Sequence, residues 1–264
     1  MRWLPALLLL LAGPAVAGPR VVSMNPCVDA ILVEVALPDQ IAAISHYSKD
    51  ARASSIGPAV AARFAATAGT AEEVAALRPD IVMTGAHVAP ATMSALRRLG
   101  ARVMQFGVPD TVAASRAQVL EIADAVGQPG RGAALNARIG AAVRAARSDG
   151  AAVPALIWMG GGLVPGRGTL ADEMLGMAGF ANVSADMGLA QWDVLPLERL
   201  VVRPPRVLLT ATAAGDDRML GHPVMKPLAG RIAVRDFAPT LLYCGGPTII
   251  RAMERLAVVR KGLR

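Results

Sequence analysis

Thiol and imidazole chemistry is confined to very few positions, because the chain holds two cysteines and three histidines. Cys27 lies in the stretch SMNPCVD near the start, and Cys244 lies in LLYCGGP near the end. Two such cysteines can pack as small apolar side chains, form a disulfide, or contact a metal or metal chelate. A disulfide requires Cα atoms within about 7 Å, so it would lock these two distant stretches together.

The histidines offer a second kind of chemistry, since neutral imidazole is a common metal ligand. His46 and His87 fall where predicted strands end, so these two and both cysteines are the candidate metal ligands. The alternative is that both histidines are ordinary polar loop residues. His222 stands beside Pro223 and is interpreted as structural.

The elements that must position these residues alternate between short apolar strands and helices in the first half of the chain. Thr70 predicts a helix N-cap, and Glu73 three residues later predicts a capping box. The predicted strands are Val21–Met24, Ile41–Ser45, Ile81–Thr84 and Arg102–Phe106, and the predicted helices are Pro26–Val35, Thr70–Leu77 and Pro90–Leu99. This βα alternation predicts a mostly parallel sheet with helices on its faces.

A helical region separates this half from a second one of the same kind. Residues 131–148 predict one helix, about 27 Å long at about 1.5 Å per residue, which can cross between two lobes. Further predicted strands are Ala155–Met159, Arg206–Thr210 and Ala233–Phe237, and further helices are Leu170–Ala178, Leu197–Val201 and Pro247–Val258. The fold class is therefore α/β, with an N-terminal lobe over residues 18–128, a connecting helix over 129–150 and a C-terminal lobe over 151–264.

Residues 1–17 read MRWLPALLLLLAGPAVA and predict a cleaved secretory signal peptide, with a basic start, an apolar run and a small-x-small end. A membrane anchor is the alternative, but prolines break an apolar run that is shorter than the ~20 residues of a span. Without Arg2 the chain has 26 basic and 20 acidic residues, a net charge of +6. The arginines are scattered, which is typical of a solubilising surface; attraction for an anionic ligand or membrane is the alternative.

In open α/β sheets, ligands bind outside the carboxyl ends of the strands, so the residues that follow each strand are candidates for a cleft between the lobes. Those candidates are Cys27, His46, Tyr47, His87, Arg167, Tyr243 and Cys244, together with Trp158 near the end of its own strand and Trp192 in the stretch that leads to the predicted helix Leu197–Val201. Aromatic residues make up only 3% of the chain, which argues against nucleic-acid binding. The sequence contains no G-x-S-x-G, H-E-x-x-H or G-x-G-x-x-G motif, and Gly160-Gly161-Gly162 lacks the lysine of a phosphate loop.

Four stretches carry a resemblance to a known family: RVVSMNPCVDAILVEV, TAEEVAALRPDIVMT, GRGTLADEMLGMAGFANV and QWDVLPLERLVVRPPRVLL. Together they resemble, in order and over nearly the whole mature chain, the periplasmic binding proteins of ABC importers for iron–siderophores, haem and cobalamin. The resemblance implies two Rossmann-like lobes joined by a rigid helix. It implies a non-enzymatic, monomeric periplasmic protein whose ligand is a metal chelate rather than a resident cofactor.

The resemblance also gives roles to particular residues. Glu72 and Glu198 match the acids, one on each lobe, that dock onto the importer's permease dimer, which works with its ATPase. Tyr47 and Trp192 match aromatic residues that line the cleft of cobalamin-type receptors. An exported α/β enzyme and a periplasmic sensor or scaffold are the alternatives. The chain has fewer aromatic residues than such clefts usually carry, so the chelate stays unidentified.

Overall fold

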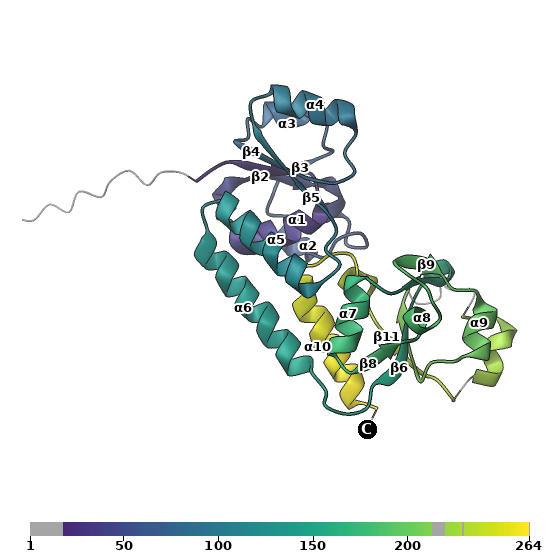
Figure 1. Ribbon diagram of the computed structural model, residues 1–264. Helices are drawn as coiled ribbons and strands as arrows, with labels where there is room; N and C mark the ends of the chain where they lie inside the picture. Colours follow the sequence, from purple (N-terminus) through teal and green to yellow (C-terminus); the bar gives the residue numbers. More distant parts are fainter. Residues whose placement is uncertain (1–17, 213–219, 229, 264) are drawn as a thin grey trace, which may run out of the picture.

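The computed structural model describes residues 18–212, 220–228 and 230–263. The predicted signal peptide lies outside these residues. Two α/β lobes lie on either side of a shared group of helices, as Figure 1 shows. Each lobe has its own parallel sheet, so the chain does not form one continuous sheet.

The N-terminal lobe is built on a five-stranded parallel sheet in the order β3-β2-β1-β4-β5. Its strands are β1 (Val21–Ser23), β2 (Ile41–Ser45), β3 (Ala66–Thr67), β4 (Ile81–Gly85) and β5 (Arg102–Phe106). Its helices are α1 (Pro26–Val35), α2 (Pro58–Ala61), α3 (Ala71–Ala76), α4 (Pro90–Arg98) and α5 (Val112–Ala125), with short 3-10 turns η1 (Pro38–Gln40) and η2 (His46–Lys49).

Both faces of this sheet are covered, which explains why its strands are nearly continuous apolar runs. Val22 and Val82 pack against Val74 of α3 and Leu96 of α4 on one face. The opposite face packs against α1 and α5 in a different apolar cluster. Because every strand is parallel, all carboxyl ends meet at one edge of the sheet, and that edge faces the other lobe.

The chain crosses to the second lobe through α6 (Pro129–Ala146), an 18-residue helix. The C-terminal lobe has a four-stranded parallel sheet in the order β11-β10-β6-β8 and a two-stranded antiparallel sheet of β7 and β9. Its strands are β6 (Val153–Met159), β7 (Leu163–Pro165), β8 (Phe180–Asn182), β9 (Trp192–Val194), β10 (Val207–Ala211) and β11 (Ala233–Asp236). Its helices are α7 (Leu170–Met177), α8 (Val183–Asp186), α9 (Leu197–Val202) and α10 (Thr248–Lys261), with 3-10 turns η3 (Gly160–Gly162), η4 (Pro223–Leu228) and η5 (Pro239–Leu241).

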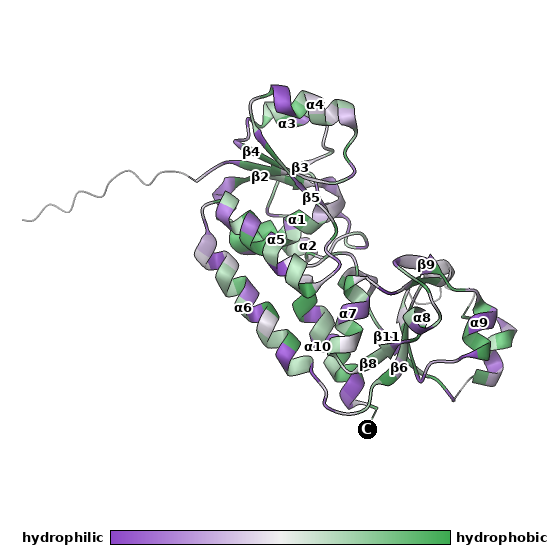
Figure 2. Ribbon diagram, viewed as in Figure 1, coloured by the Kyte–Doolittle hydropathy of each residue, from purple (hydrophilic) through white to green (hydrophobic). Residues whose placement is uncertain are grey.

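The two lobes share one hydrophobic core. Helix α6 packs against α5 on one side and α10 on the other, and α7 also contacts both α5 and α10. The largest apolar cluster therefore runs from Val21 in the first strand to Val259 in the last helix. Figure 2 shows apolar and polar residues alternating along α6 and α10, as expected of helices with one buried face. The predicted two-lobe α/β fold with a long connecting helix is confirmed, and α10 lies alongside that helix.

Several short elements were not predicted. The interval from Tyr47 to Gly69, where no strand or helix was predicted, contains α2 and the edge strand β3. Strands β7, β8 and β9 and helix α8 were also missed. Each of these strands has two or three residues, too few to show an alternating pattern. Their existence depends on partners far along the chain.

The capping box at α3 is only half formed. The Thr70 hydroxyl oxygen accepts a hydrogen bond from the Glu73 amide, as predicted. The Glu73 carboxylate does not return to Thr70, because it accepts hydrogen bonds from the Thr67 hydroxyl and the Ala68 amide. These bonds lower the pKa of Glu73 below its usual value and fix the loop before α3.

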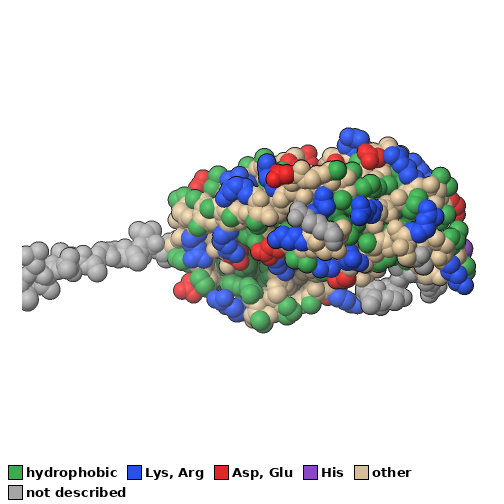
Figure 3. Space-filling view, turned by 90° about the horizontal axis from the view of Figure 1, so that it is seen from below, with side chains coloured by type: hydrophobic (Ala, Val, Ile, Leu, Met, Phe, Trp, Pro, Cys, Tyr) green, Lys and Arg blue, Asp and Glu red, His purple; other side chains and the backbone are tan. Residues whose placement is uncertain are grey.

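Basic side chains are scattered over the face of the molecule drawn in Figure 3, with acidic side chains between them. This arrangement agrees with the interpretation of the arginines as a solubilising surface. Among the described residues, no helix has both the length and the apolar character needed to cross a membrane.

Candidate functional site

A cleft of about 460 Å³ lies between the lobes and is lined mainly by apolar groups. The N-terminal lobe contributes Asn25, Cys27 and residues 107–110, and the C-terminal lobe contributes Met159, Leu163, residues 168–171, Met174, Gln191, Trp192 and residues 242–245. Most of these segments follow the carboxyl ends of strands, where ligands bind in such sheets. Its volume is in the usual range for a small-molecule site.

The stretch SMNPCVD forms part of the cleft because it is the N-terminus of α1. Asn25 is the N-cap: its side-chain oxygen accepts hydrogen bonds from the amides of Cys27, at 2.8 Å, and Val28, at 3.4 Å. Pro26 takes the first helical position, where its missing N–H group costs nothing. The asparagine and proline together therefore fix the backbone that carries Cys27.

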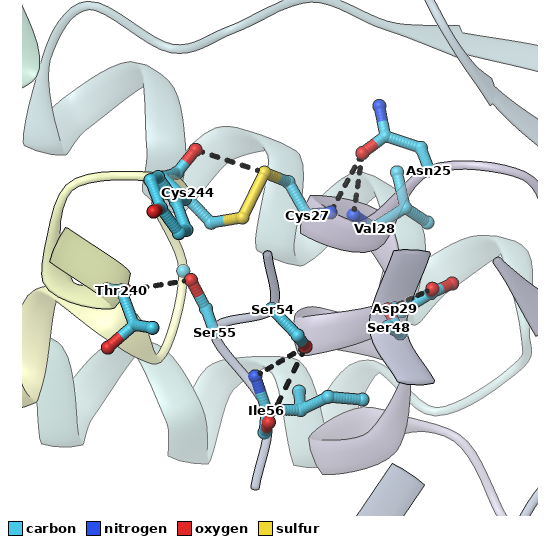
Figure 4. The surroundings of a disulfide bond; sticks show 12 residues. Asn25, Cys27, Val28, Asp29, Ser48, Ser54, Ser55, Ile56, Thr240 and Cys244 are labelled. Atoms are coloured by element: carbon cyan, nitrogen blue, oxygen red, sulfur yellow. Dashed lines mark hydrogen bonds between the residues drawn. A yellow bond between two sulfur atoms is a disulfide. The ribbon is translucent and has the colours of Figure 1, made fainter. Parts of the chain in front are cut away.

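Cys27 and Cys244 form a disulfide, with their Cα atoms 5.1 Å apart (Figure 4). The structure thus selects the disulfide among the three possibilities left by the sequence. Cys27 Sγ also lies 3.2 Å from the carbonyl oxygen of Tyr243. The bond joins α1 of the N-terminal lobe to the loop before α10 and forms part of the cleft wall.

Further contacts hold the same loop region against the N-terminal lobe. The Ser55 hydroxyl donates to the Thr240 carbonyl at 2.9 Å, and the Gly246 amide donates to the Ser115 hydroxyl oxygen at 2.7 Å. A Cβ atom on Gly245 would lie only 2.4 Å from the Ser115 hydroxyl, so this close approach requires glycine. The wall is therefore fixed by covalent, polar and steric contacts.

Asp29 lies behind the wall and is fully buried. Its Oδ2 accepts hydrogen bonds from the Ser45 amide at 2.9 Å and the Ser48 hydroxyl at 2.6 Å, which ties α1 to the turn η2. Its Oδ1 has no hydrogen-bond partner. Burial raises the pKa of Asp29 to about 7, and the hydrogen bonds from Ser48 and Ser45 act in the opposite direction.

Two of the predicted aromatic residues line the cleft. Trp192 stands on β9 and is 39% exposed, and Tyr243 lies in the loop next to the disulfide. Gln191, just before the tryptophan, has a φ of +56°, an uncommon value for a residue with a side chain. Its backbone is held there by hydrogen bonding with Arg167, whose carbonyl accepts from the Gln191 amide at 2.9 Å.

Trp158 and Arg167 do not line the cleft, so the prediction that they contact the ligand is wrong. Trp158 is completely buried and packs with Leu156 and Leu208 in the second apolar cluster of the C-terminal lobe. Side chains alternate between the two faces of a strand, so Met159 at the end of β6 lines the cleft while its neighbour Trp158 points into the core. Arg167 positions the backbone beside Trp192, and its guanidinium donates to the Ala185 carbonyl at 3.3 Å.

His46, Tyr47 and His87 are exposed and lie outside the cleft lining. The rings of His46 and Tyr47 contact each other in a tilted arrangement, with centroids 4.1 Å apart. No group of three or more potential metal-ligating side chains occurs within the described part of the chain. The four candidate metal ligands are therefore not brought together, and both cysteine sulfurs are already joined to each other.

Two parts of the cleft were missed. Residues 107–110 follow β5 and include Asp110, the one charged side chain among the described residues that line the cleft. The rule that selected the other candidates applies equally to this strand, so they could have been found. Residues 168–171 and Met174 lie around the start of α7, which follows the short strand β7, and that strand was not predicted.

Glu72 and Glu198 are both exposed and both stand in the first turn of a helix, α3 and α9 respectively. These helices lie at the outer ends of the two lobes (Figure 1). Each acid is therefore free of the cleft and presented on its own lobe.

Comparison with known proteins gives a consistent result. The family model for periplasmic binding proteins matches residues 21–229. No curated protein matches the chain. Solved structures with the same fold include a periplasmic haem-binding protein from Pseudomonas aeruginosa, with 23% identity, a TM-score of 0.71 and coverage of 92% of each chain.

Two structures from Vibrio cholerae are similar in the same way. Its periplasmic haem-binding protein HutB shares 16% identity at a TM-score of 0.75, covering 91% of this chain and 98% of that one. Its periplasmic vitamin B12-binding protein BtuF shares 17% identity at a TM-score of 0.71, covering 93% of this chain and 97% of that one.

Proposed function

The chain belongs to the periplasmic binding protein family, and from this premise we propose that it captures a bulky metal chelate in the periplasm and delivers it to an ABC importer. The observation that carries the proposal is the apolar cleft between the lobes, with Trp192 and Tyr243 in its lining. Flat aromatic faces suit a macrocycle. The absence of a metal-ligating cluster among the described residues favours a metal that arrives inside its own chelate.

The charge of the cleft narrows the class of chelate. Among the described residues that line it, Asp110 is the one charged group, and no lysine, arginine or histidine is present. A strongly anionic ferric catecholate, or the propionates of haem, would enter this cleft without a basic partner, which is unfavourable for a desolvated anion. Cobalamin carries little net charge, so it is the chelate that the lining favours.

Equilibrium titration of the purified protein with cyanocobalamin, haem and a ferric catecholate tests this proposal, with absorbance and tryptophan fluorescence as readouts. We expect cyanocobalamin to bind at least about tenfold more tightly than the ferric catecholate, equivalent to about 1.4 kcal/mol. Failure of all three to bind at micromolar concentration would refute capture of a chelate. Preference for the anionic chelate would refute the argument from charge.

Delivery depends on Glu72 and Glu198, which we propose dock onto basic sites of the permease dimer, one from each lobe. Reversal of both charges, Glu72→Lys with Glu198→Lys, should abolish ATP-dependent uptake by the reconstituted importer and leave chelate affinity unchanged. A matched control reverses Glu121, which is exposed on α5. Uptake that survives the double reversal would remove these residues from the docking surface.

A further inference from the structure

The Cys27–Cys244 disulfide is accessible from the cleft. Both cysteines line it, and Cys27 is half-buried, whereas Cys244 is only 6% exposed. A thiolate that enters the cleft therefore reaches Cys27 Sγ more readily than Cys244 Sγ. Exposed disulfides are more often labile, regulatory or catalytic than buried structural ones, so the position of this bond in the wall of an open cleft points to chemistry rather than to stability alone.

The reduced state is favoured locally at Cys27. The residue lies in the first turn of the ten-residue helix α1. Cys27 Sγ also lies 3.2 Å from the Tyr243 carbonyl oxygen. The sulfur of a disulfide carries no hydrogen, so this contact becomes a hydrogen bond only when Cys27 is a thiol. A disulfide whose reduced form is stabilised is more easily reduced.

Reduction leaves the rest of the molecule held together. Helix α10 packs along α6, and its residues Ile249, Met253 and Leu256 are buried in the shared core. The hydrogen bonds from Ser55 to Thr240 and from Gly246 to Ser115 do not involve the sulfurs. The part that loses its covalent anchor is residues 242–245, which includes Tyr243 and forms one wall of the cleft.

We propose that this disulfide is a thiol–disulfide exchange site for a dithiol reductant, and that its reduction loosens residues 242–245. One thiolate of the dithiol attacks Cys27 Sγ, the S–S bond breaks, and Cys244 leaves as a thiolate that takes up a proton. The second thiol then loses its proton and attacks the dithiol sulfur of the mixed disulfide, and Cys27 leaves as a thiolate that takes up a proton. The protein gains two electrons, and the dithiol becomes a disulfide.

The rate of reduction tests the exchange site without any chelate. The oxidised protein is treated with dithiothreitol in native buffer and in urea, and free thiols are counted by maleimide labelling and mass spectrometry. We expect the two rates to agree within about tenfold, because the bond is reached without unfolding. A native rate more than about a hundredfold slower would show that reduction requires unfolding, and would overturn the proposal.

Hydrogen–deuterium exchange tests the structural consequence. On reduction, amides of residues 242–245 should exchange about tenfold faster or more, while those of β6 stay unchanged. The double variant Cys27→Ser with Cys244→Ser is the matched control. Its amide exchange should resemble that of the reduced protein and should not change when reductant is added. Unchanged exchange at residues 242–245, or faster exchange throughout the molecule, would overturn the proposed local loosening.

The effect on binding rests on the proposed function. If cyanocobalamin is the chelate bound, the reduced protein and the double variant should bind it about tenfold more weakly than the oxidised protein, because Tyr243 must then be ordered on binding. Equal affinity in both states would overturn control of the cleft. Failure of the oxidised protein to bind counts only against the proposed function, since the rate and exchange measurements use no chelate.

Discussion

Replacing Asp29 by asparagine should remove a pH dependence that this single carboxyl gives to stability. Asp29 is fully buried, its Oδ2 accepts hydrogen bonds from Ser45 and Ser48, and its Oδ1 has no partner. Burial without a cation makes the charged form costly, which raises the pKa from the usual 3.8 to about 7. Asparagine has nearly the same shape and retains an oxygen that can accept both hydrogen bonds.

The direction of this pH dependence of stability follows from proton linkage. Because the pKa is higher in the folded state, the folded protein binds this proton more tightly than the unfolded chain. The stabilisation is complete below about pH 4 and is lost as the pH rises to about 7. At about 1.4 kcal/mol per pH unit, the free energy of unfolding should fall by about 2–3 kcal/mol between pH 5 and pH 8 through this group.

Urea unfolding at several pH values between 5 and 8 measures the effect. Other groups titrate in this range, so the informative quantity is the wild-type stability minus that of Asp29→Asn. This difference should decrease by about 2–3 kcal/mol across the range, and the variant should be favoured relative to wild type most strongly at pH 8. A difference that stays constant with pH would show that Asp29 keeps one protonation state throughout, and the assigned desolvation would be wrong.

Two further substitutions test the cleft and its wall. Trp192→Ala should weaken chelate binding about tenfold or more in a titration that does not rely on fluorescence. His87→Ala, outside the cleft, is the control and should leave the affinity unchanged. Equal losses of affinity in the two variants would argue against the assigned cleft. Gly245→Ala should lower the free energy of unfolding by about 1–3 kcal/mol in urea titrations, because its Cβ would clash with the Ser115 hydroxyl. Gly130→Ala is the control, because a Cβ there would have nothing within 4 Å. Equal stabilities of the two variants would contradict the predicted clash.

The elements that could be predicted are those whose signal is local. Helix α3 begins at the predicted N-cap Thr70, and α6 covers most of the region predicted from residue 131. Each strand of the predicted βα units is a short apolar run, since its sheet is covered on both faces. By contrast, β7 and β9 pair far along the chain, with Val164 opposite Asp193, and a run of three residues gives no signal of such a partner.

The residues of the candidate site could likewise be predicted only where the signal is local. Strand ends can be located from the sequence, so Cys27 and Tyr243 were placed correctly beside the cleft, whereas Trp192 was placed there through the family resemblance. The direction of a side chain within a strand depends on which face meets the core, and Trp158 was misplaced for this reason. The disulfide was one of three possibilities, because the separation of Cys27 and Cys244 in space depends on how two lobes pack.

The packing of the two lobes also affects how the cleft binds its ligand. Glu34 of α1 accepts hydrogen bonds from Arg138 at 2.8 Å through its carboxylate and from Arg131 at 2.9 Å through its carbonyl, which ties the N-terminal lobe to α6. The Glu173 carboxylate of α7 accepts from the Val112 amide of α5, which ties the lobes to each other beside the cleft. With the disulfide in place, most of the ordering of the cleft walls is completed during folding and oxidation. A chelate then binds without the cost of bringing the lobes together, and the change in affinity expected on reduction comes from the wall that the disulfide anchors.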